Sequence, residues 1–255
     1  MDADLERRFG GIGRLYGDAA LAAFRNSSVA VVGIGGVGSW VAEALARCAV
    51  GRITLIDLDN VAESNTNRQV HALGDAYGKA KVTAMAERIR AINPACVVTE
   101  IEEFVMPENT AALLDRNFDV VIDAIDQVRA KVAMIAWCRR QNLPIVVAGG
   151  AGGKIDPSRI RLDDLSRTEQ DPLLARVRSQ LRKEHGFTRD PKKKFGIPVV
   201  YSAEPIRQPE SGAACETGTV HGGLNCAGFG SSVCITATFG LFAASAALGL
   251  IQEKA

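Results

Sequence analysis

A glycine-rich turn between two patterned segments most tightly limits the folds open to this chain. An apolar run covers residues 29–32, the turn reads GIGGVG over 33–38, and the segment 39–49 has the apolar spacing of a helix. Glycines in such a turn let the backbone bend sharply and let its N–H groups approach a phosphate at the positive end of the helix. The pattern predicts a strand, a phosphate-binding turn and a helix in succession.

The same alternation of strand and helix patterns continues along the chain. Strands are expected at 53–57, 96–101, 118–123 and 145–148, and helices at 79–92, near 108–116 and at 128–141. Such alternation is typical of a parallel sheet with helices on both faces. The strand runs VAVV and ITLID are apolar without alternation, as strands buried on both faces require. The fold class expected is α/β, with a Rossmann-like, mostly parallel sheet.

The regular alternation of strand and helix patterns ends after the GGAGG run at 149–153. A short strand near 159–162, a polar helix over 172–185 and a strand at 198–203 precede a loop over 204–228 that is rich in glycine, serine and proline and could cover a site. Sheets of this size commonly fold as one unit, so we expect one domain over 1–255. Its halves would be a nucleotide-binding part, 1–153, and a second part, 154–255, with mixed strands and a buried apolar helix.

Charge and cysteine usage exclude several classes of protein. The 30 Lys and Arg nearly balance the 29 Asp and Glu, so any nucleic-acid-binding surface must be local. The charged start MDADLERRFG lacks the apolar core of a signal peptide and favours the cytoplasm. The cysteines form no CxxC pair, which argues against structural zinc and against a disulfide framework; they are Cys48, Cys96, Cys138, Cys215, Cys226 and Cys234.

One segment leaves a membrane location open. Residues 233–251 carry no charge and would be long enough to cross a bilayer as a helix. The segment is rich in Ala, Gly, Ser and Thr and lacks basic flanks, which favours a helix packed closely inside the protein or at a subunit interface.

Charged residues after the strands indicate which nucleotide is bound. Asp57 follows the second strand, 19 residues beyond Gly38, where a carboxylate can bind ribose hydroxyls of either NAD or ATP. Arg68 and Lys81 favour ATP, because attack on its α-phosphorus builds up charge that fixed cations stabilise. Asp126, after the strand 118–123, is expected to hold Mg²⁺ on the phosphates. Taken singly, each residue could equally be a surface charge or a helix cap.

Several motifs together resemble the ThiF/MoeB/HesA superfamily of ubiquitin-activating-enzyme-like adenylyltransferases. They are GIGGVGS, LIDLDNVAESNTNRQ, the lysine of GKAK, and DAID. The resemblance implies adenylation of a carboxylate by ATP, with Arg68, Lys81 and Asp126 as catalytic residues. With the outer glycines of the turn, the expected nucleotide-binding residues are Gly33, Gly35, Gly36, Gly38, Asp57, Asp59, Asn65, Arg68, Gln69 and Lys81.

Further segments resemble the tRNA threonylcarbamoyladenosine dehydratase branch of that superfamily. They include RRFGGIGRLYG, AGGAGGKIDPSRIRLDDLSRTEQDPL and CAGFGSSVCITATFG. This likeness implies a homodimer that dehydrates threonylcarbamoyladenosine beside the tRNA anticodon by adenylating its threonine carboxylate. It also associates the chain with a cysteine desulfurase system as a possible partner. A role for Cys226 or Cys234 and the identity of any bound monovalent ion stay open.

One departure from the superfamily concerns an arginine that reaches the partner subunit's ATP. Gly11 stands at the aligned position. Arg14 is the expected replacement and Arg8 the alternative, although either could be a surface charge on the first helix.

A local concentration of basic residues is the expected tRNA contact. It consists of Arg176, Arg178, Arg182, Lys183, Arg189, Lys192, Lys193 and Lys194. A solvated helix and loop would show the same composition, and Phe187 and Phe195 could stack on bases or anchor the loop.

Two other functions stay open from sequence. One is an adenylyltransferase for the C-terminal carboxylate of a ubiquitin-like sulfur carrier, which the missing CxxC pairs disfavour. The other is a nucleotide-sensing protein without chemistry. A hydride-transfer enzyme ranks lower because it leaves Arg68 and Lys81 unexplained.

Overall fold

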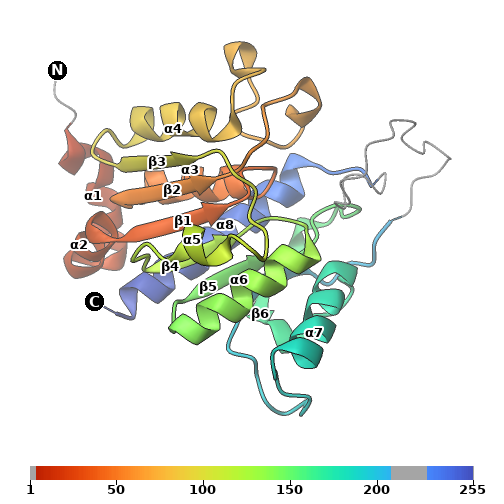
Figure 1. Cartoon of the computed structure of the whole chain (residues 1–255). Helices are drawn as coiled ribbons and strands as arrows, with labels where there is room; N and C mark the ends of the chain where they lie inside the picture. Colours follow the sequence, from red (N-terminus) through yellow and green to blue (C-terminus); the bar gives the residue numbers. More distant parts are fainter. Residues whose placement is uncertain (1–3, 208–228, 255) are drawn as a thin grey trace.

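A single seven-stranded sheet runs through the computed structural model, which describes residues 4–207 and 229–254. The strand order is β3-β2-β1-β4-β5-β7-β6, and every neighbouring pair is parallel except β6 and β7 (Figure 1). The mostly parallel α/β fold predicted from sequence is confirmed. The strands are β1 (Ser28–Val32), β2 (Arg52–Ile56), β3 (Val97–Ile101), β4 (Val120–Asp123), β5 (Ile145–Ala148), β6 (Ile160–Asp164) and β7 (Pro198–Ser202).

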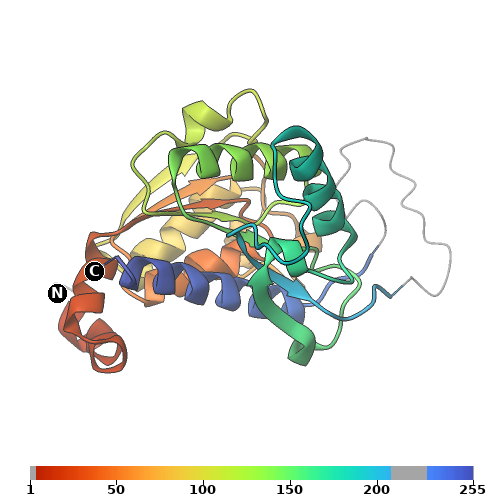
Figure 2. The same cartoon turned by 90° about the horizontal axis from the view of Figure 1, so that it is seen from below.

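Helices cover both faces of the sheet (Figure 2). Helices α2, α3, α4 and α8 pack on one face, and α5, α6 and α7 pack on the other. The helices are α1 (Leu5–Tyr16), α2 (Asp18–Asn26), α3 (Gly38–Arg47), α4 (Lys81–Ile92), α5 (Thr110–Leu114), α6 (Val128–Gln141), α7 (Pro172–Glu184) and α8 (Val233–Gln252). Single 3₁₀ turns lie at Glu63–Asn65, Gly74–Ala76, Pro157–Arg159 and Leu165–Arg167.

The apolar strand sequences follow from this two-sided packing. In β1, Val29 and Val31 belong to the core under α3 and α8, whereas Ala30 and Val32 belong to the core under α6. Successive side chains of a strand point to opposite faces, so a strand buried on both faces carries apolar residues at every position.

Helix α8 accounts for the uncharged C-terminal segment. It is long and apolar enough to cross a membrane, with a mean hydropathy of 1.9, yet half of its apolar stretch is buried in the protein. A side-chain carbon at Gly240 would lie 2.7 Å from both Trp40 Cβ and the carbonyl oxygen of Val37, so only glycine lets α8 approach α3 this closely. The predicted apolar helix is confirmed, and packing on α3 and the sheet accounts for its buried half, while Leu241 and Phe242 are exposed.

Candidate nucleotide-binding site

The glycine turn between β1 and α3 requires glycine at its first and last positions. Gly33 has φ +85°, and a side-chain carbon there would lie 2.8 Å from the side chain of Ile125. A side-chain carbon at Gly38 would lie 1.7 Å from the carbonyl oxygen of Gly33. The backbone N–H of Gly33 donates to the carbonyl of Ile56 at 2.9 Å, which ties the turn to β2. The turn thus brings backbone N–H groups to the positive end of α3.

Asp57 lies directly after β2 and is held by backbone groups. Its Oδ2 accepts a 2.6 Å hydrogen bond from the N–H of Ile34, and its Oδ1 accepts one of 2.9 Å from the N–H of Asp59. Burial raises the pKa of Asp57 above its usual range, while the charge of Lys81 and the two N–H donors act in the opposite direction. The carboxylate therefore has a fixed position beside the glycine turn.

Lys81 begins α4 and is 6% exposed. Its Nζ lies 2.7 Å from Asp59 Oδ2, while Asp59 itself is more than half exposed. A buried lysine held by an exposed carboxylate can change partners, because the carboxylate regains water when a phosphate approaches the ammonium. The ammonium is thereby kept at the C-terminal end of β2.

Arg68 approaches the glycine turn from the loop between β2 and α4. Its guanidinium donates to the carbonyl of Ser64 and to Asn67 Oδ1, both at 2.8 Å. A side-chain carbon at Gly36 would lie 3.2 Å from two carbons of the Arg68 side chain. The arginine stem therefore crosses the glycine turn.

Two buried polar residues of the same loop were also expected to bind nucleotide. Asn65 Oδ1 accepts a 3.1 Å hydrogen bond from the N–H of Ala62 and thereby folds the loop. Gln69 is buried, and its Oε1 has no hydrogen-bond partner among the described residues. Asn65 thus shapes the loop, whereas the buried Gln69 amide oxygen has no role that the described contacts show.

Asp126 lies in the turn that follows β4, where it is partly exposed. The strands β1 and β4 are neighbours, and the backbone of Ala124 lies 3.1 Å from where Gly33 would carry a side chain. The C-terminal ends of β1, β2 and β4 thus bring together the glycine turn, Asp57, Arg68, Lys81 and Asp126. Open parallel sheets bind ligands at these strand ends, where the strand order reverses.

The two candidate arginines of α1 do not join this site within one chain. Arg8 donates to the carbonyls of Ala91 and Ile92 at the C-terminal end of α4, at 2.9 and 2.7 Å. Arg14 is exposed in the last turn of α1, and α1 lies at the opposite end of the sheet from the glycine turn (Figure 1). Contact between Arg14 and a nucleotide would require a second copy of the chain.

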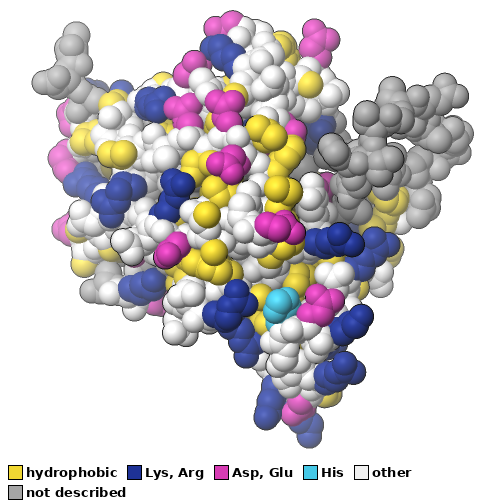
Figure 3. Space-filling view, in the orientation of Figure 1, with side chains coloured by type: hydrophobic (Ala, Val, Ile, Leu, Met, Phe, Trp, Pro, Cys, Tyr) yellow, Lys and Arg dark blue, Asp and Glu magenta, His cyan; other side chains and the backbone are white. Residues whose placement is uncertain are grey.

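The basic residues on and after α7 fall into two groups. Figure 3 shows Lys and Arg side chains gathered where α7 and the following loop protrude from the molecule. Arg178 is partly buried and donates to the carbonyl of Thr168 at 2.8 Å, and Arg182 donates to the carbonyl of Thr188 at 3.2 Å. The others are exposed and are called the basic surface below: Arg176, Lys183, Arg189, Lys192, Lys193 and Lys194.

The two phenylalanines near the basic surface anchor its loop. Phe187 and Phe195 are buried and meet edge to face with 4.9 Å between ring centroids. The guanidinium of Arg139 lies 4.1 Å from the Phe187 centroid, and that of Arg182 lies 5.3 Å from the Phe195 centroid. Of the two alternatives drawn from sequence, the structure supports packing over base stacking.

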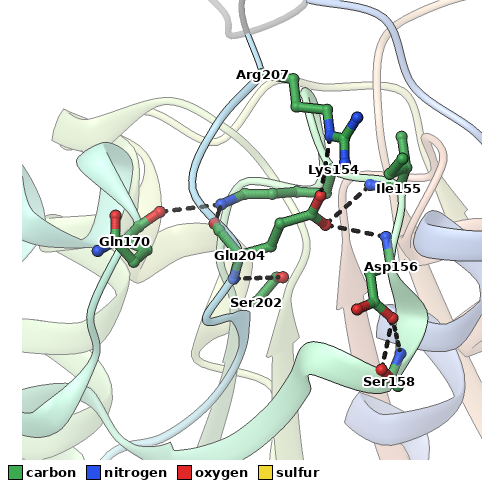
Figure 4. Close-up of polar contacts among 8 residues, drawn as sticks. All are labelled: Lys154, Ile155, Asp156, Ser158, Gln170, Ser202, Glu204 and Arg207. Atoms are coloured by element: carbon green, nitrogen blue, oxygen red, sulfur yellow. Dashed lines mark hydrogen bonds and ion pairs between the residues drawn. The ribbon is translucent and has the colours of Figure 1, made fainter.

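Two buried charge clusters near the strand ends were missed by the sequence interpretation. Asp123 and Lys131 form a fully buried ion pair of 2.9 Å. Lys154 lies under the turn after β5, where its Nζ donates to the carbonyls of Gln170 and Glu204 (Figure 4). A lysine on the apolar face of the helix 128–141 was the available signal for the first cluster.

Most of the remaining cysteine and histidine candidates fall outside the described residues. These are Cys215, Cys226 and His221. Cys234 is exposed in the first turn of α8. Within 4–207 and 229–254, no group of three or more His, Cys, Asp or Glu side chains is placed to hold a metal ion.

Comparison with known proteins places the whole chain in one family. The ThiF family matches residues 11–253. The tRNA threonylcarbamoyladenosine dehydratases of Haemophilus influenzae and Escherichia coli are 49% and 50% identical, each over 98% of this chain and 95% of their own length. An adenylyltransferase and sulfurtransferase of Zea mays is 36% identical over 49% of this chain.

Solved structures agree with these sequence matches. The crystal structure of the Escherichia coli dehydratase TcdA in complex with ATP is 48% identical, with a TM-score of 0.89 over 100% of this chain and 98% of that one. The complex of the same enzyme with AMP gives a TM-score of 0.88. This chain belongs to the ThiF family and, within it, to the group of the tRNA threonylcarbamoyladenosine dehydratases.

Proposed function

We propose that this protein uses ATP to dehydrate threonylcarbamoyladenosine next to the anticodon of tRNA. The observation that carries the proposal is the meeting of the glycine turn, Arg68, Lys81 and Asp126 at the C-terminal ends of three adjacent strands. The likeness to the dehydratases over almost the full length supports the choice of acceptor.

The proposed chemistry has two steps that balance without an outside reagent. A carboxylate oxygen of the threonyl group attacks the α-phosphorus of ATP, and pyrophosphate leaves with the electron pair of the broken P–O bond. The carbamoyl group of the same nucleoside then attacks the acyl carbon, loses a proton and expels AMP. The nucleoside loses one water overall, and both nucleophiles belong to the substrate, so positioning and electrostatics suffice.

Each site residue has a role in this scheme. Asp57 binds ribose hydroxyls, and the N–H groups of the glycine turn bind phosphate oxygens. Lys81 and Arg68 stabilise the charge that develops on the α-phosphoryl group and on pyrophosphate. Asp126 suits Mg²⁺ because it is a partly exposed carboxylate beside the phosphate turn, and the ion would draw charge from the phosphates when bound.

The partners follow from the surface. The basic surface on α7 is proposed to hold tRNA phosphates, and Arg14 is proposed to reach the ATP of a second subunit in a homodimer. A cytoplasmic location fits a tRNA substrate. A cysteine desulfurase system stays a proposed partner through the family resemblance alone.

The alternative acceptor is the C-terminal carboxylate of a sulfur-carrier protein. Relatives named adenylyltransferase and sulfurtransferase match about half of this chain, and the match to the dehydratases continues through α7 and the basic surface. The two acceptors are separated by incubating the protein and ATP with modified tRNA or with a carrier protein. AMP release with tRNA alone supports dehydration, and AMP release that needs the carrier contradicts it.

The metal-side role of Asp126 is tested with the same assay. Asp126→Asn should lower turnover about a hundredfold, and part of the loss should be recovered at higher magnesium concentration. Turnover close to that of the unchanged protein would contradict the role.

A further inference from the structure

A fully buried ion pair joins the end of β4 to the first turn of α6. Lys131 Nζ lies 2.9 Å from Asp123 Oδ1, and both side chains have no exposed area. The same carboxylate oxygen accepts a 3.2 Å hydrogen bond from the N–H of Ile125. Because Asp123 is the last residue of β4, the pair holds the carboxylate that folds the turn 124–127 at the end of the strand.

The turn 124–127 packs directly on the glycine turn. The N–H of Ala124 donates to the carbonyl of Val32 at 2.8 Å. A side-chain carbon at Gly33 would lie 2.8 Å from the side chain of Ile125 and 3.1 Å from the Ala124 backbone. At the other end, the N–H of Lys131 donates to the carbonyl of Gln127 at 3.0 Å. The segment that carries Asp126 is thus fixed at both ends.

Stability of the fold alone does not explain this pair. Burying two charges costs several kcal/mol per ion, and apolar residues of similar size often stabilise a fold equally well or better. Asp123 Oδ2 and Lys131 Nζ have no other polar partner among the residues the structure describes. Because burying this pair costs free energy, its presence indicates that the turn needs one particular geometry.

A second buried carboxylate, that of Asp171, orders the turn after β5. Burial raises the pKa of Asp171 above its usual range, while its two backbone N–H donors and the charges of Lys154 and Lys131 act in the opposite direction. Asp171 Oδ2 accepts a 2.8 Å hydrogen bond from the N–H of Gly150 and leaves no room for a side chain at Gly149. Buried carboxylates therefore order two neighbouring turns at the C-terminal edge of the sheet.

We propose that Lys131 and Asp123 are positioning residues for the nucleotide. Their ion pair holds the turn 124–127 against the glycine turn, so that Asp126 and the phosphate-binding N–H groups keep the geometry that binds and activates ATP. The proposal rests on the ATP-binding part of the proposed function and is independent of the acceptor.

The test removes both charges together, because Lys131→Met alone would leave a buried, uncompensated carboxylate and cost stability. The double variant Lys131→Met/Asp123→Leu keeps the site apolar and removes the hydrogen bond to Ile125. Thermal unfolding should show a folded protein, while the dissociation constant of magnesium-ATP rises at least about tenfold and kcat for AMP release falls with an unchanged KM for tRNA.

A second buried acid provides the matched control. Glu43 of α3 is 4% exposed and pairs with Arg88 of α4 at 2.6 Å, away from the turn 124–127. Glu43→Gln/Arg88→Met should alter the melting temperature and leave ATP affinity within about twofold.

Three outcomes overturn the proposal. The first is a folded Lys131→Met/Asp123→Leu variant with unchanged ATP affinity and kcat, and the second is equal loss of affinity in the Glu43 control. The third is a double variant that fails to fold, which would assign the pair to the fold itself. If the unchanged protein released no AMP with modified tRNA, the proposed function would be wrong. The positioning role of the pair would still be tested by comparing the ATP affinities of the variants.

Discussion

The nucleotide end of the sheet and the basic surface hold their charges in different ways. Lys81 is buried against Asp59, and Asp57 has both oxygens bonded to backbone N–H groups. On the basic surface, Lys192, Lys193 and Lys194 are exposed on a loop. Fixed, desolvated charges stabilise a transition state, whereas exposed charges attract a polyanion and are screened by salt. The chemistry and the tRNA affinity should therefore respond to different substitutions.

The largest expected effect is that of Lys81→Ala. Loss of the buried ammonium should lower kcat for AMP formation at least about a thousandfold, or about 4 kcal/mol. The fold should survive, because the remaining carboxylate of Asp59 is more than half exposed. The matched control is Lys79→Ala, which removes a surface lysine 3.0 Å from Glu87. Equal rates for the two variants would place the chemistry elsewhere.

Burial of His71 should also make the free energy of unfolding depend on pH. Burial, with the charges of Lys81 and Arg88, lowers the pKa of His71 from 6.5 to about 4. The unfolded chain then binds a proton that the folded protein does not, so stability is full above about pH 6.5 and falls as the pH drops toward 4. The loss should reach about 3 kcal/mol. Denaturant unfolding of His71→Gln should show a flatter profile over that range, and an unchanged slope would contradict the assignment.

Removing the lysine charges of the exposed loop should change only the affinity for tRNA. Replacing Lys192, Lys193 and Lys194 by alanine should raise KM for tRNA about tenfold, lower the slope of log affinity against log salt by about 2, and leave kcat within about twofold. Filter binding at several salt concentrations measures the slope. A fall in kcat with an unchanged KM would instead connect this loop with catalysis.

The weakest effects are expected for Arg176 and Arg178, which lie two residues apart on α7. Arg178 donates to the carbonyl of Thr168, whereas Arg176 is exposed. Arg178→Ala should cost about 1 kcal/mol of unfolding free energy, and Arg176→Ala less than about 0.5 kcal/mol. For tRNA affinity the order should reverse. If both variants lose affinity equally, Arg178 belongs to the basic surface as the sequence predicted.

Sequence patterns predicted the elements that bury apolar side chains. The helix expected at 128–141 and the strand expected at 145–148 were observed with those bounds. The bounds differ where the backbone is not helical. The helix expected from 79 begins at Lys81, because Gly78 has φ +85° and Ala80 has ψ 137°. Helix α2 was not expected at all.

Within the candidate site too, the sequence predicted the residues of local motifs and missed the residues that packing brings together. Local motifs predicted the glycine turn and the residues after β2 and β4, because their spacing is set by the chain itself. The buried pair of Asp123 and Lys131, and the contact of Lys154 with Glu204, join residues whose proximity depends on the packing of α6 and on the end of β7. Periodicity carries no information about such partners.

Adenylation of the threonine carboxylate is tested most directly by following its oxygen atoms. The direct measurement supplies tRNA whose threonylcarbamoyl carboxylate carries a heavy isotope at both oxygens, together with the protein and ATP, and follows the label by mass spectrometry. Adenylation predicts one heavy oxygen in each AMP released, with a nucleoside lighter by one water. Heavy oxygen found in inorganic phosphate, with ADP in place of AMP, would contradict it.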